Sequence, residues 1–163
     1  MTMDEVNALD TEQFVEKVGW VYEHSPWVAR RASASRPFPS FDDLCARLSN
    51  CVTEASREEQ LDLLRAHPDL GTRARVSPSS TREQAGVGLD RLTQEEYDLL
   101  LELNSAWKEK FGFPFLYAVK GSDKFAIMEA MRRRLNSAPQ EEFEEALRQV
   151  FRIAGYRLEE IVR

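Results

Sequence analysis

The stretch Arg65-Ala66-His67-Pro68-Asp69-Leu70-Gly71 shows the pattern on which the whole fold is built, an apolar helical repeat that runs into a proline and stops. Proline disfavours the α conformation in the residue before it, so we predict a helix ending at His67 and a turn through Gly71. His67 is one of two histidines in the chain. A ring at a helix end can be reached by a ligand, and the helix dipole favours its protonated form. The position fits a proton donor, or a cap whose ring hydrogen-bonds the last carbonyls.

The same pattern recurs along the chain: a capping residue, an apolar stripe at helical spacing, and then a proline or glycine. Capping boxes predict helix starts at Asp10, Ser56 and Thr93, and Pro139 begins the last helix. A chain of 163 residues is long enough for one domain with a real core and too short for two ordinary ones. We therefore expect an all-α fold, a single domain spanning residues 1–163, built as an irregular bundle of about seven to eight helices.

Prolines and glycines also mark the segments that are not helical. Ser25 and Ser40 each precede an expected helix and predict an N-cap, and a proline-rich loop before Ser40 should tuck Phe38 inward. Residues 68–79 show little apolar periodicity and predict a surface loop. Residues 113–119 form the most apolar run, but a proline inside it excludes a simple helix interior. We expect a buried irregular segment or a short strand-like stretch there.

Composition and charge exclude several classes of partner. The chain is 42% hydrophobic and 31% charged, which is typical of a globular protein, and its net charge of −6 gives no attraction to nucleic acid or anionic membrane. No window approaches the roughly 18 apolar residues of a membrane span. The first residues lack the features of a signal peptide, and the chain does not end in a Ser-Lys-Leu peroxisomal address. We expect a cytoplasmic protein without nucleic-acid or membrane partners.

Cysteine and histidine usage argues against a metal or a disulfide framework. Cys45 and Cys51 would not share a helix face, so we interpret them as small core residues in a reducing compartment. His24 and His67 have no nearby cluster with ligand spacing, so no metal is expected. A Ser-His-Asp hydrolase is not supported, because no Gly-x-Ser-x-Gly elbow is present.

A second polar group of interest lies at Ser80, Glu83 and Gln84. Ser80 and Glu83 have the spacing of a capping box, which would be a purely structural role. Gln84 adds an amide directly beside Glu83, and the glycines at 86 and 88 permit close backbone approach. A helix N-terminus in this setting can bind a small anion or a polarised carbonyl, and a carboxylate there can exchange protons. The residues alone leave both interpretations open.

Two arginine patterns complete the candidates. Arg157 falls on the apolar ridge of the last helix, with Val150, Ala154 and Ile161. An arginine there either snorkels, forms a buried ion pair or faces a ligand carboxylate, and the residues do not choose among these. The run 132–134 consists of three arginines and predicts the solvated face of a helix end, with an oligomer contact and an anion site as the alternatives.

Four motifs in a fixed order now suggest a family. They are His67-Pro68-Asp69-Leu70-Gly71; Ser80-x-x-Glu83-Gln84 followed by Gly88-Leu89; Phe111-Gly112-Phe113-Pro114-Phe115 with Ala118-Val119-Lys120-Gly121; and Ile153-Ala154-x-x-Arg157-Leu158. Together they resemble the 2-oxo-4-hydroxy-4-carboxy-5-ureidoimidazoline (OHCU) decarboxylases of urate breakdown, and the similarity extends over nearly the whole chain.

The resemblance implies an all-α, cofactor-independent, homodimeric enzyme with a small ureidoimidazoline as its substrate. Carried over by motif, His67 would be the general acid, Glu83 its acid/base partner, Gln84 a substrate-orienting amide and Arg157 a catalytic contact to substrate charge. The implied substrate-binding wall consists of Pro68, Ser80 and the backbone of Phe115, Leu116, Tyr117, Ala118 and Val119.

The implied reaction is decarboxylation to (S)-allantoin. The carbon that loses CO₂ also bears a hydroxyl and lies next to a C=N bond, which accepts the electrons, so no organic cofactor is required. Two alternatives compete with this expectation. One is a non-catalytic helical interaction module that docks a partner on residues 113–119, and the other is a related ureide hydrolase.

Overall fold

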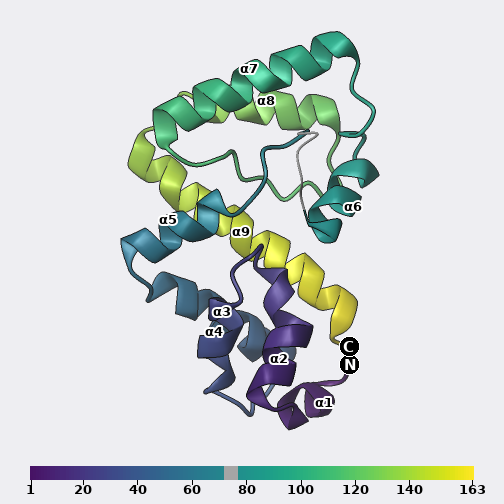
Figure 1. Ribbon diagram of the computed structural model, residues 1–163, viewed down its shortest axis with the longest axis vertical. Helices are drawn as coiled ribbons and strands as arrows, with labels where there is room; N and C mark the ends of the chain where they lie inside the picture. The colour runs from purple at the N-terminus through teal and green to yellow at the C-terminus, as the bar shows by residue number, and fades with distance from the viewer. Residues whose placement is uncertain (72–76) are drawn as a thin grey trace. The chain divides into compact units, whose positions relative to one another are not determined.

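The computed structural model describes residues 1–71 and 77–163, and in these ranges it contains nine α-helices, one 3₁₀ turn and no strand (Figure 1). The helices are α1 (Met3–Ala8), α2 (Thr11–Val18), α3 (Trp27–Ser33), α4 (Phe41–Thr53), α5 (Arg57–Arg65), α6 (Pro78–Gly86), α7 (Gln94–Phe111), α8 (Lys124–Arg134) and α9 (Pro139–Ile161), with the turn η1 (Gly19–Val21) after α2. The all-α prediction is confirmed. The count slightly exceeds the expected seven to eight, because a helix as short as α1 shows no apolar period.

The chain divides into two compact units. Unit 1 comprises Met1–Ala66 and Val150–Arg163, and unit 2 comprises His67–Gln149. Helix α9 contributes its first part to unit 2 and its remainder to unit 1. The single domain expected for residues 1–163 stays a prediction.

Unit 1 begins its helices largely where the sequence predicts. Asp10 and Ser56 form capping boxes, and the Ser40 hydroxyl accepts the Asp43 N–H. The predicted cap at Ser25 is wrong: Pro26 occupies the N-cap position of α3, and the Ser25 hydroxyl instead donates to the Glu23 carbonyl at 2.9 Å. The expected inward loop residue is confirmed, since the Phe38 side chain is buried and its ring lies 5.8 Å from that of Phe14.

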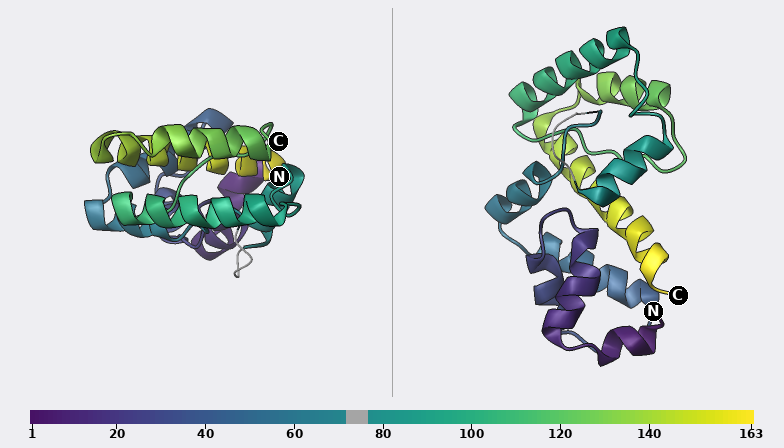
Figure 2. Two further views of the ribbon diagram at one scale, coloured as in Figure 1. Left: turned by 90° about the horizontal axis from the view of Figure 1, so that it is seen from above. Right: turned by 45° about the vertical axis from the view of Figure 1, so that its right-hand side comes forward.

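Unit 2 is built around α7 and α8, which lie side by side (Figure 2). Helix α7 starts at the predicted Thr93 capping box and ends at Gly112, which adopts a left-handed conformation. Its apolar side chains enter a core shared with α8 and the segment 113–119. The buried members of this core are Leu70, Leu89, Leu100, Leu103, Trp107, Phe115, Val119, Ile127, Met128, Ala130 and Met131.

Residues 113–119 form an irregular buried segment, so the first of the two expected conformations is confirmed and the strand-like stretch is not found. No helix or strand is assigned there, and every residue except the half-buried Tyr117 is buried. An irregular segment inside a core must satisfy its backbone polar groups without a helix or sheet ladder. Side chains from α8 and α9 supply those bonds, as the candidate site shows.

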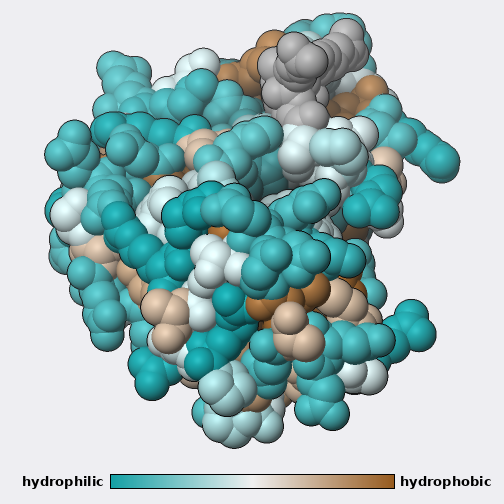
Figure 3. Space-filling view, turned by 60° about the horizontal axis from the view of Figure 1, so that its bottom comes forward, coloured by the Kyte–Doolittle hydropathy of each residue, from teal (hydrophilic) through white to brown (hydrophobic). Residues whose placement is uncertain are grey.

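The surface agrees with the composition. Polar residues cover most of the face shown in Figure 3, and hydrophobic residues appear between them in small areas. The large apolar side chains exposed in the described ranges are Leu101 and Phe125. None of the described helices is long and apolar enough to cross a membrane.

Candidate active site

His67 lies just beyond α5, where the chain enters unit 2. The helix ends at Arg65, and the N–H of the capping residue Ala66 donates to the Asp62 carbonyl at 2.9 Å. His67 is largely buried, with 8% of its surface exposed. The turn that follows carries Leu70 into the core of unit 2, and it draws the histidine in with it. A buried imidazole is shielded from bulk water, which suits controlled proton transfer.

The turn after His67 is fixed to α7 at three points. The Lys108 ammonium lies 2.7 Å from the Asp69 carboxylate, and the Asn104 amide donates to the Leu70 carbonyl at 3.1 Å. Gly71 has a φ of +71°, and a Cβ at this position would lie 2.2 Å from Leu100 Cδ2. Glycine is therefore required both by its backbone conformation and by the close approach of α7.

Helix α6 starts three residues earlier than the predicted Ser80 cap. Ser77 is the N-cap, its hydroxyl accepts the Ser80 N–H at 3.1 Å, and Pro78 takes the first helical position. The capping box of Ser80 with Glu83 is therefore wrong, because a serine followed by proline makes a stronger helix start. Ser80 is buried inside the first turn and Glu83 lies further along the helix. The predicted loop 68–79 is correspondingly shorter, and its residues 72–76 lie outside the described ranges.

Gln84 joins α6 to the turn that follows His67. The Gly71 N–H donates to Gln84 Oε1 at 2.8 Å. This bond fixes the orientation of the amide, because only the oxygen can accept from an N–H. It also places the helix that carries Glu83 and Gln84 beside the histidine turn.

The segment 113–119 is held by two side chains that the sequence did not suggest. The Arg134 guanidinium donates to the Leu116 carbonyl at 2.9 Å and lies 4.6 Å from the centre of the Phe115 ring. Gln149 Oε1 accepts the Ala118 N–H at 3.0 Å. The expected wall therefore has a fixed backbone, in which the Leu116 carbonyl and the Ala118 N–H are already bonded within the protein.

Arg134 also corrects the expectation of a fully solvated arginine run. It is buried and forms an ion pair with Glu142, while Arg132 and Arg133 are exposed. Burial raises the pKa of the Glu142 carboxyl, and the guanidinium opposes that effect. The buried Arg134–Glu142 ion pair thus helps to hold the segment 113–119 in its conformation.

Three of the four sequence motifs meet in one core of unit 2. Leu70 comes from the histidine turn, Leu89 from the glycine-rich segment after α6, and Phe115 and Val119 from the wall. The Trp107 ring packs edge-on against Phe115 at 4.8 Å and connects this core to α7. Residues that are up to about fifty positions apart in the chain are in this way brought to one region.

The fourth motif lies in unit 1. Arg157 is 3% exposed, its guanidinium lies 2.9 Å from the Glu23 carboxylate, and it also donates to the Val21 carbonyl at 3.3 Å. Of the three alternatives for this residue, the structure matches the buried ion pair. A contact between Arg157 and substrate charge stays a prediction.

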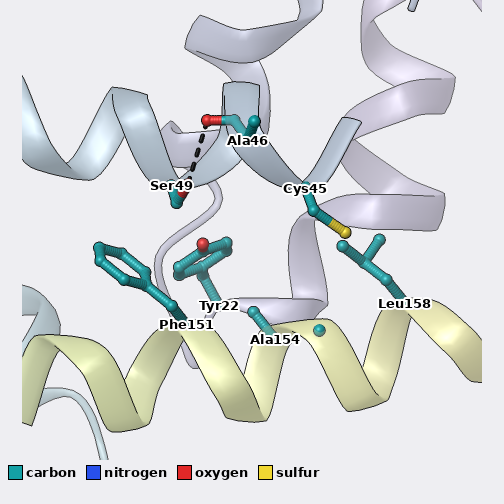
Figure 4. Close-up of a pocket in the computed structure, with 8 residues that line it drawn as sticks. Tyr22, Cys45, Ala46, Ser49, Phe151, Ala154 and Leu158 are labelled. Atoms are coloured by element: carbon teal, nitrogen blue, oxygen red, sulfur yellow. Dashed lines mark hydrogen bonds between the residues drawn. The ribbon is translucent and has the colours of Figure 1, made fainter. Parts of the chain in front are cut away.

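A pocket of about 150 Å³ lies in unit 1 between α4 and α9 (Figure 4). Tyr22, Cys45, Phe151 and Leu158 contribute to its lining, and none of the predicted site residues does. Burial raises the pKa of both the Tyr22 hydroxyl and the Cys45 thiol. Neither group is therefore an activated nucleophile at neutral pH. Among the residues that the structure describes, no group of three His, Cys, Asp or Glu side chains could hold a metal ion.

A buried histidine beside a helix that carries a carboxylate and an oriented amide is compatible with acid–base chemistry on an all-α fold. The sequence profile of the OHCU decarboxylase family matches residues 7–159. The chain belongs to this family.

Two relatives that carry the same family name match over nearly their full length, and a third, longer relative matches over part of its length. The 2-oxo-4-hydroxy-4-carboxy-5-ureidoimidazoline decarboxylase of Haloferax volcanii is 48% identical, and the match covers 98% of this chain and 95% of that protein. The enzyme named likewise in Mus musculus is 33% identical, with 99% and 93% covered. The uric acid degradation bifunctional protein of Bacillus subtilis is 45% identical, and the match covers 99% of this chain and 33% of that protein.

Solved structures show the same fold. A crystal structure of (S)-allantoin synthase aligns with a TM-score of 0.82 at 28% identity and covers 99% of this chain and 54% of that chain. An OHCU decarboxylase crystallised in the presence of (S)-allantoin aligns with a TM-score of 0.70 at 23% identity, over 83% of this chain and 89% of that chain. At that identity the second match supports the fold alone.

We predict that Gly71→Ala destabilises the protein more than Gly121→Ala. Both glycines have positive φ, +71° and +80°, so both variants bear a similar backbone strain of about 1–2 kcal/mol. Only at Gly71 does the new methyl group meet the buried Leu100, which adds about 1–3 kcal/mol of overpacking. Urea unfolding of the two variants measures the difference, and equal losses would contradict the close approach of α7.

We predict that Arg157→Met lowers the free energy of unfolding by about 3–5 kcal/mol, because it leaves the buried Glu23 carboxylate without its counterion. Adding Glu23→Gln should recover much of the loss. Arg152→Met, on the exposed face of α9, is the matched control and should change stability by less than about 0.5 kcal/mol. An Arg157→Met variant as stable as this control would show that the ion pair contributes nothing.

Proposed function

We propose that this protein decarboxylates 2-oxo-4-hydroxy-4-carboxy-5-ureidoimidazoline to (S)-allantoin in urate degradation. The proposal is supported by membership of the OHCU decarboxylase family and by full-length relatives that bear this name. One structural observation carries it furthest: the Gly71–Gln84 hydrogen bond places the histidine turn beside the helix of Glu83 and Gln84.

The reaction needs three proton transfers around one bond cleavage. The bond between the ring carbon and the carboxylate breaks, CO₂ leaves, and the electron pair moves toward the adjacent C=N bond, whose nitrogen takes up a proton. An enol remains. The enol hydroxyl then loses its proton to become a carbonyl, and the neighbouring carbon gains a proton on one face. The carboxylate substrate thus consumes one proton overall and yields one CO₂.

His67 and Glu83 are the proposed proton carriers. One of them takes the hydroxyl proton, and the other, which we assign as His67, delivers a proton to carbon. Positioned proton transfer contributes about 10²–10⁴-fold, so holding the leaving carboxylate out of the ring plane must supply part of the remaining acceleration. Imidazole is the side chain whose ordinary pKa allows both loss and gain of a proton near neutral pH.

Gln84 is the proposed orienting amide. Its fixed conformation determines whether it offers a hydrogen-bond donor or an acceptor to the substrate. Because Oε1 accepts the Gly71 N–H, the –NH₂ end is the one left to face other groups. A primary amide presented in this way donates to a carbonyl or carboxylate oxygen of the substrate. Pro68, Ser80 and the backbone of residues 115–119 form the proposed wall, within which Arg134 and Gln149 fix the conformation.

Arg157 is proposed as an electrostatic contact to the substrate carboxylate, a role that rests on the family motif alone. Its observed partners are Glu23 and the Val21 carbonyl. Loss of kcat in an Arg157→Lys variant of wild-type stability would support the contact, and unchanged kinetics would leave only the structural role.

Two properties complete the proposal. We infer that the protein is a homodimer. Sedimentation equilibrium at micromolar concentration tests this, and a mass equal to the 18.8 kDa of one chain would exclude the dimer. We also infer a cytoplasmic location, which cell fractionation would test. The alternative of a non-catalytic interaction module would leave the substrate's decay rate unchanged, and a ureide hydrolase would release an amine product instead of CO₂.

We predict that His67→Asn and Glu83→Gln each lower the rate of (S)-allantoin formation by at least about 10²-fold, because each removes a positioned proton carrier while keeping a polar side chain of similar size. Circular dichroism of the product, from freshly generated substrate, measures rate and stereochemistry together. Glu95→Gln, an exposed carboxylate in the first turn of α7, is the matched control and should keep full activity. Near wild-type turnover of the His67 variant would refute the assigned mechanism.

A further inference from the structure

We propose that Asn104 is a positioning residue of this site: through the peptide unit between Leu70 and Gly71, it determines which end of the Gln84 amide faces the substrate. The inference rests on the proposed function for its kinetic consequences, but the structural coupling can be measured without any activity. Asn104 does not belong to the motifs from which the site was predicted, whereas the peptide lies within the motif His67-Pro68-Asp69-Leu70-Gly71.

Asn104 is a polar residue on an otherwise apolar face. It is 4% exposed, and Leu100, Leu103 and Trp107 surround it on the same side of α7. Its Nδ2 donates to the Leu70 carbonyl, while its Oδ1 is buried and accepts no hydrogen bond from the described residues. Leaving half of a buried amide unsatisfied is costly, and leucine would fill a similar volume without that cost. The single donated bond must therefore matter at this position.

The bond reaches Gln84 through one peptide group. In a trans peptide the C=O and the N–H point in opposite directions. The Leu70 carbonyl is held by Asn104 on α7, and the Gly71 N–H of the same peptide donates to Gln84 Oε1 on α6. The peptide thus bridges the two helices, and each of its polar groups has one defined partner.

Because residue 71 is glycine, the peptide plane between Leu70 and Gly71 can adopt two opposite orientations. Rotation of the peptide plane by half a turn would change the φ of Gly71 from +71° to a negative value, and glycine adopts both readily. The flipped peptide would present its carbonyl to Gln84, so the amide would rotate and donate its –NH₂ to the protein. The Gln84 Oε1 atom would then face the substrate, so that the amide would offer the substrate a hydrogen-bond acceptor in place of a donor.

Asn104 opposes the flip because its donor bond to the Leu70 carbonyl would be lost, and the buried Asn104 amide would itself have to rotate before its Oδ1 could accept the Gly71 N–H. The other contacts of α7 with the turn lack this selectivity. Lys108 binds the Asp69 carboxylate, which lies outside the peptide, and Leu100 only limits the space around the Gly71 Cα. Of the described contacts between α7 and the turn, the bond from Asn104 is the one that depends on the direction of the peptide.

The first experiment compares Asn104→Leu with Ser105→Ala, an exposed position on the same helix. We expect Asn104→Leu to lower kcat/KM by about tenfold or more, while the thermal midpoint stays equal or rises. Ser105→Ala should leave both unchanged. A residue with a purely structural role would lower the midpoint and leave kcat/KM per folded molecule unchanged, and that result would overturn the proposal.

The second experiment measures the pH dependence of kcat/KM in the variant Asn104→Asp, which places a titratable group at the same position. A protonated carboxyl can donate to the Leu70 carbonyl, whereas a carboxylate repels it. Burial raises the pKa of such a group, so the donor form should return as the pH falls. We expect kcat/KM of Asn104→Asp, divided by that of the wild-type protein at each pH, to rise toward one at lower pH. A flat ratio would contradict the donor role.

Nuclear magnetic resonance separates this inference from the proposed function. Side-chain amide signals of Gln84 and the backbone signal of Gly71 report the bridge directly in ¹⁵N-labelled protein. Asn104→Leu should shift both sets of signals, and Ser105→Ala should shift neither. If the wild-type protein fails to decarboxylate the substrate while these shifts occur, the function is wrong and the positioning holds. If it decarboxylates and the signals do not move, the positioning is wrong.

Discussion

The peptide group between Leu70 and Gly71 is the connection on which the arrangement of unit 2 depends. It accepts a hydrogen bond from α7 and donates one to α6, so two helices that lie on either side of it in the core are held by one rigid plane. The histidine precedes this plane by three residues, and the carboxylate and amide lie on the helix that it holds. Hydrogen bonds in such a chain polarise one another in a low dielectric, which strengthens the bridge beyond its separate bonds. The glycine gives the chain room to pass under Leu100, and it also leaves the peptide free to turn unless its carbonyl is held.

The same solution recurs at several points where irregular backbone is buried in the described part of the chain. Asn7 both donates to and accepts from the backbone of Phe38 in the proline-rich loop, and Arg157 donates to the Val21 carbonyl in the 3₁₀ turn. Arg134 and Gln149 do so for the wall segment, as Asn104 does for the histidine turn. A buried backbone group outside a helix or sheet must find a partner, and in each case a polar side chain from a neighbouring helix supplies it. These polar side chains are therefore explained by the loops they hold, and two of those loops, the histidine turn and the segment 113–119, carry residues of the candidate site.

This recurrence also explains which features the sequence could predict. Capping boxes at Asp10, Ser56 and Thr93 were predictable because cap and partner are three residues apart. The error at Ser80 was also local, since Ser77 with Pro78 competes for the same helix start and prevails. Asn104 and Gln149 gave no comparable signal, because their backbone partners are 34 and 31 residues away. The arginine run at 132–134 was interpreted from its charge, but only the fold shows that its last member turns into the core. The family resemblance suggested the residues of the candidate site, and the contacts show what holds the elements that carry them.

Burial of His67 changes the physical argument for its role. At an open helix end, bulk water would compete with the His67 ring in protonating the enol intermediate, and water can protonate an enol from either face. A ring that is 8% exposed competes with little water, so the face of the carbon that receives the proton is decided by where the protein holds the substrate. Stereospecific protonation therefore depends on the elements that orient the substrate as much as on the acid itself. The amide of Gln84 can do this only while its donor end points outward, which the Leu70–Gly71 peptide ensures. The proposed acid and the proposed orienting group are thus positioned by the same short turn, and a disturbance of that turn should affect stereochemistry and rate together.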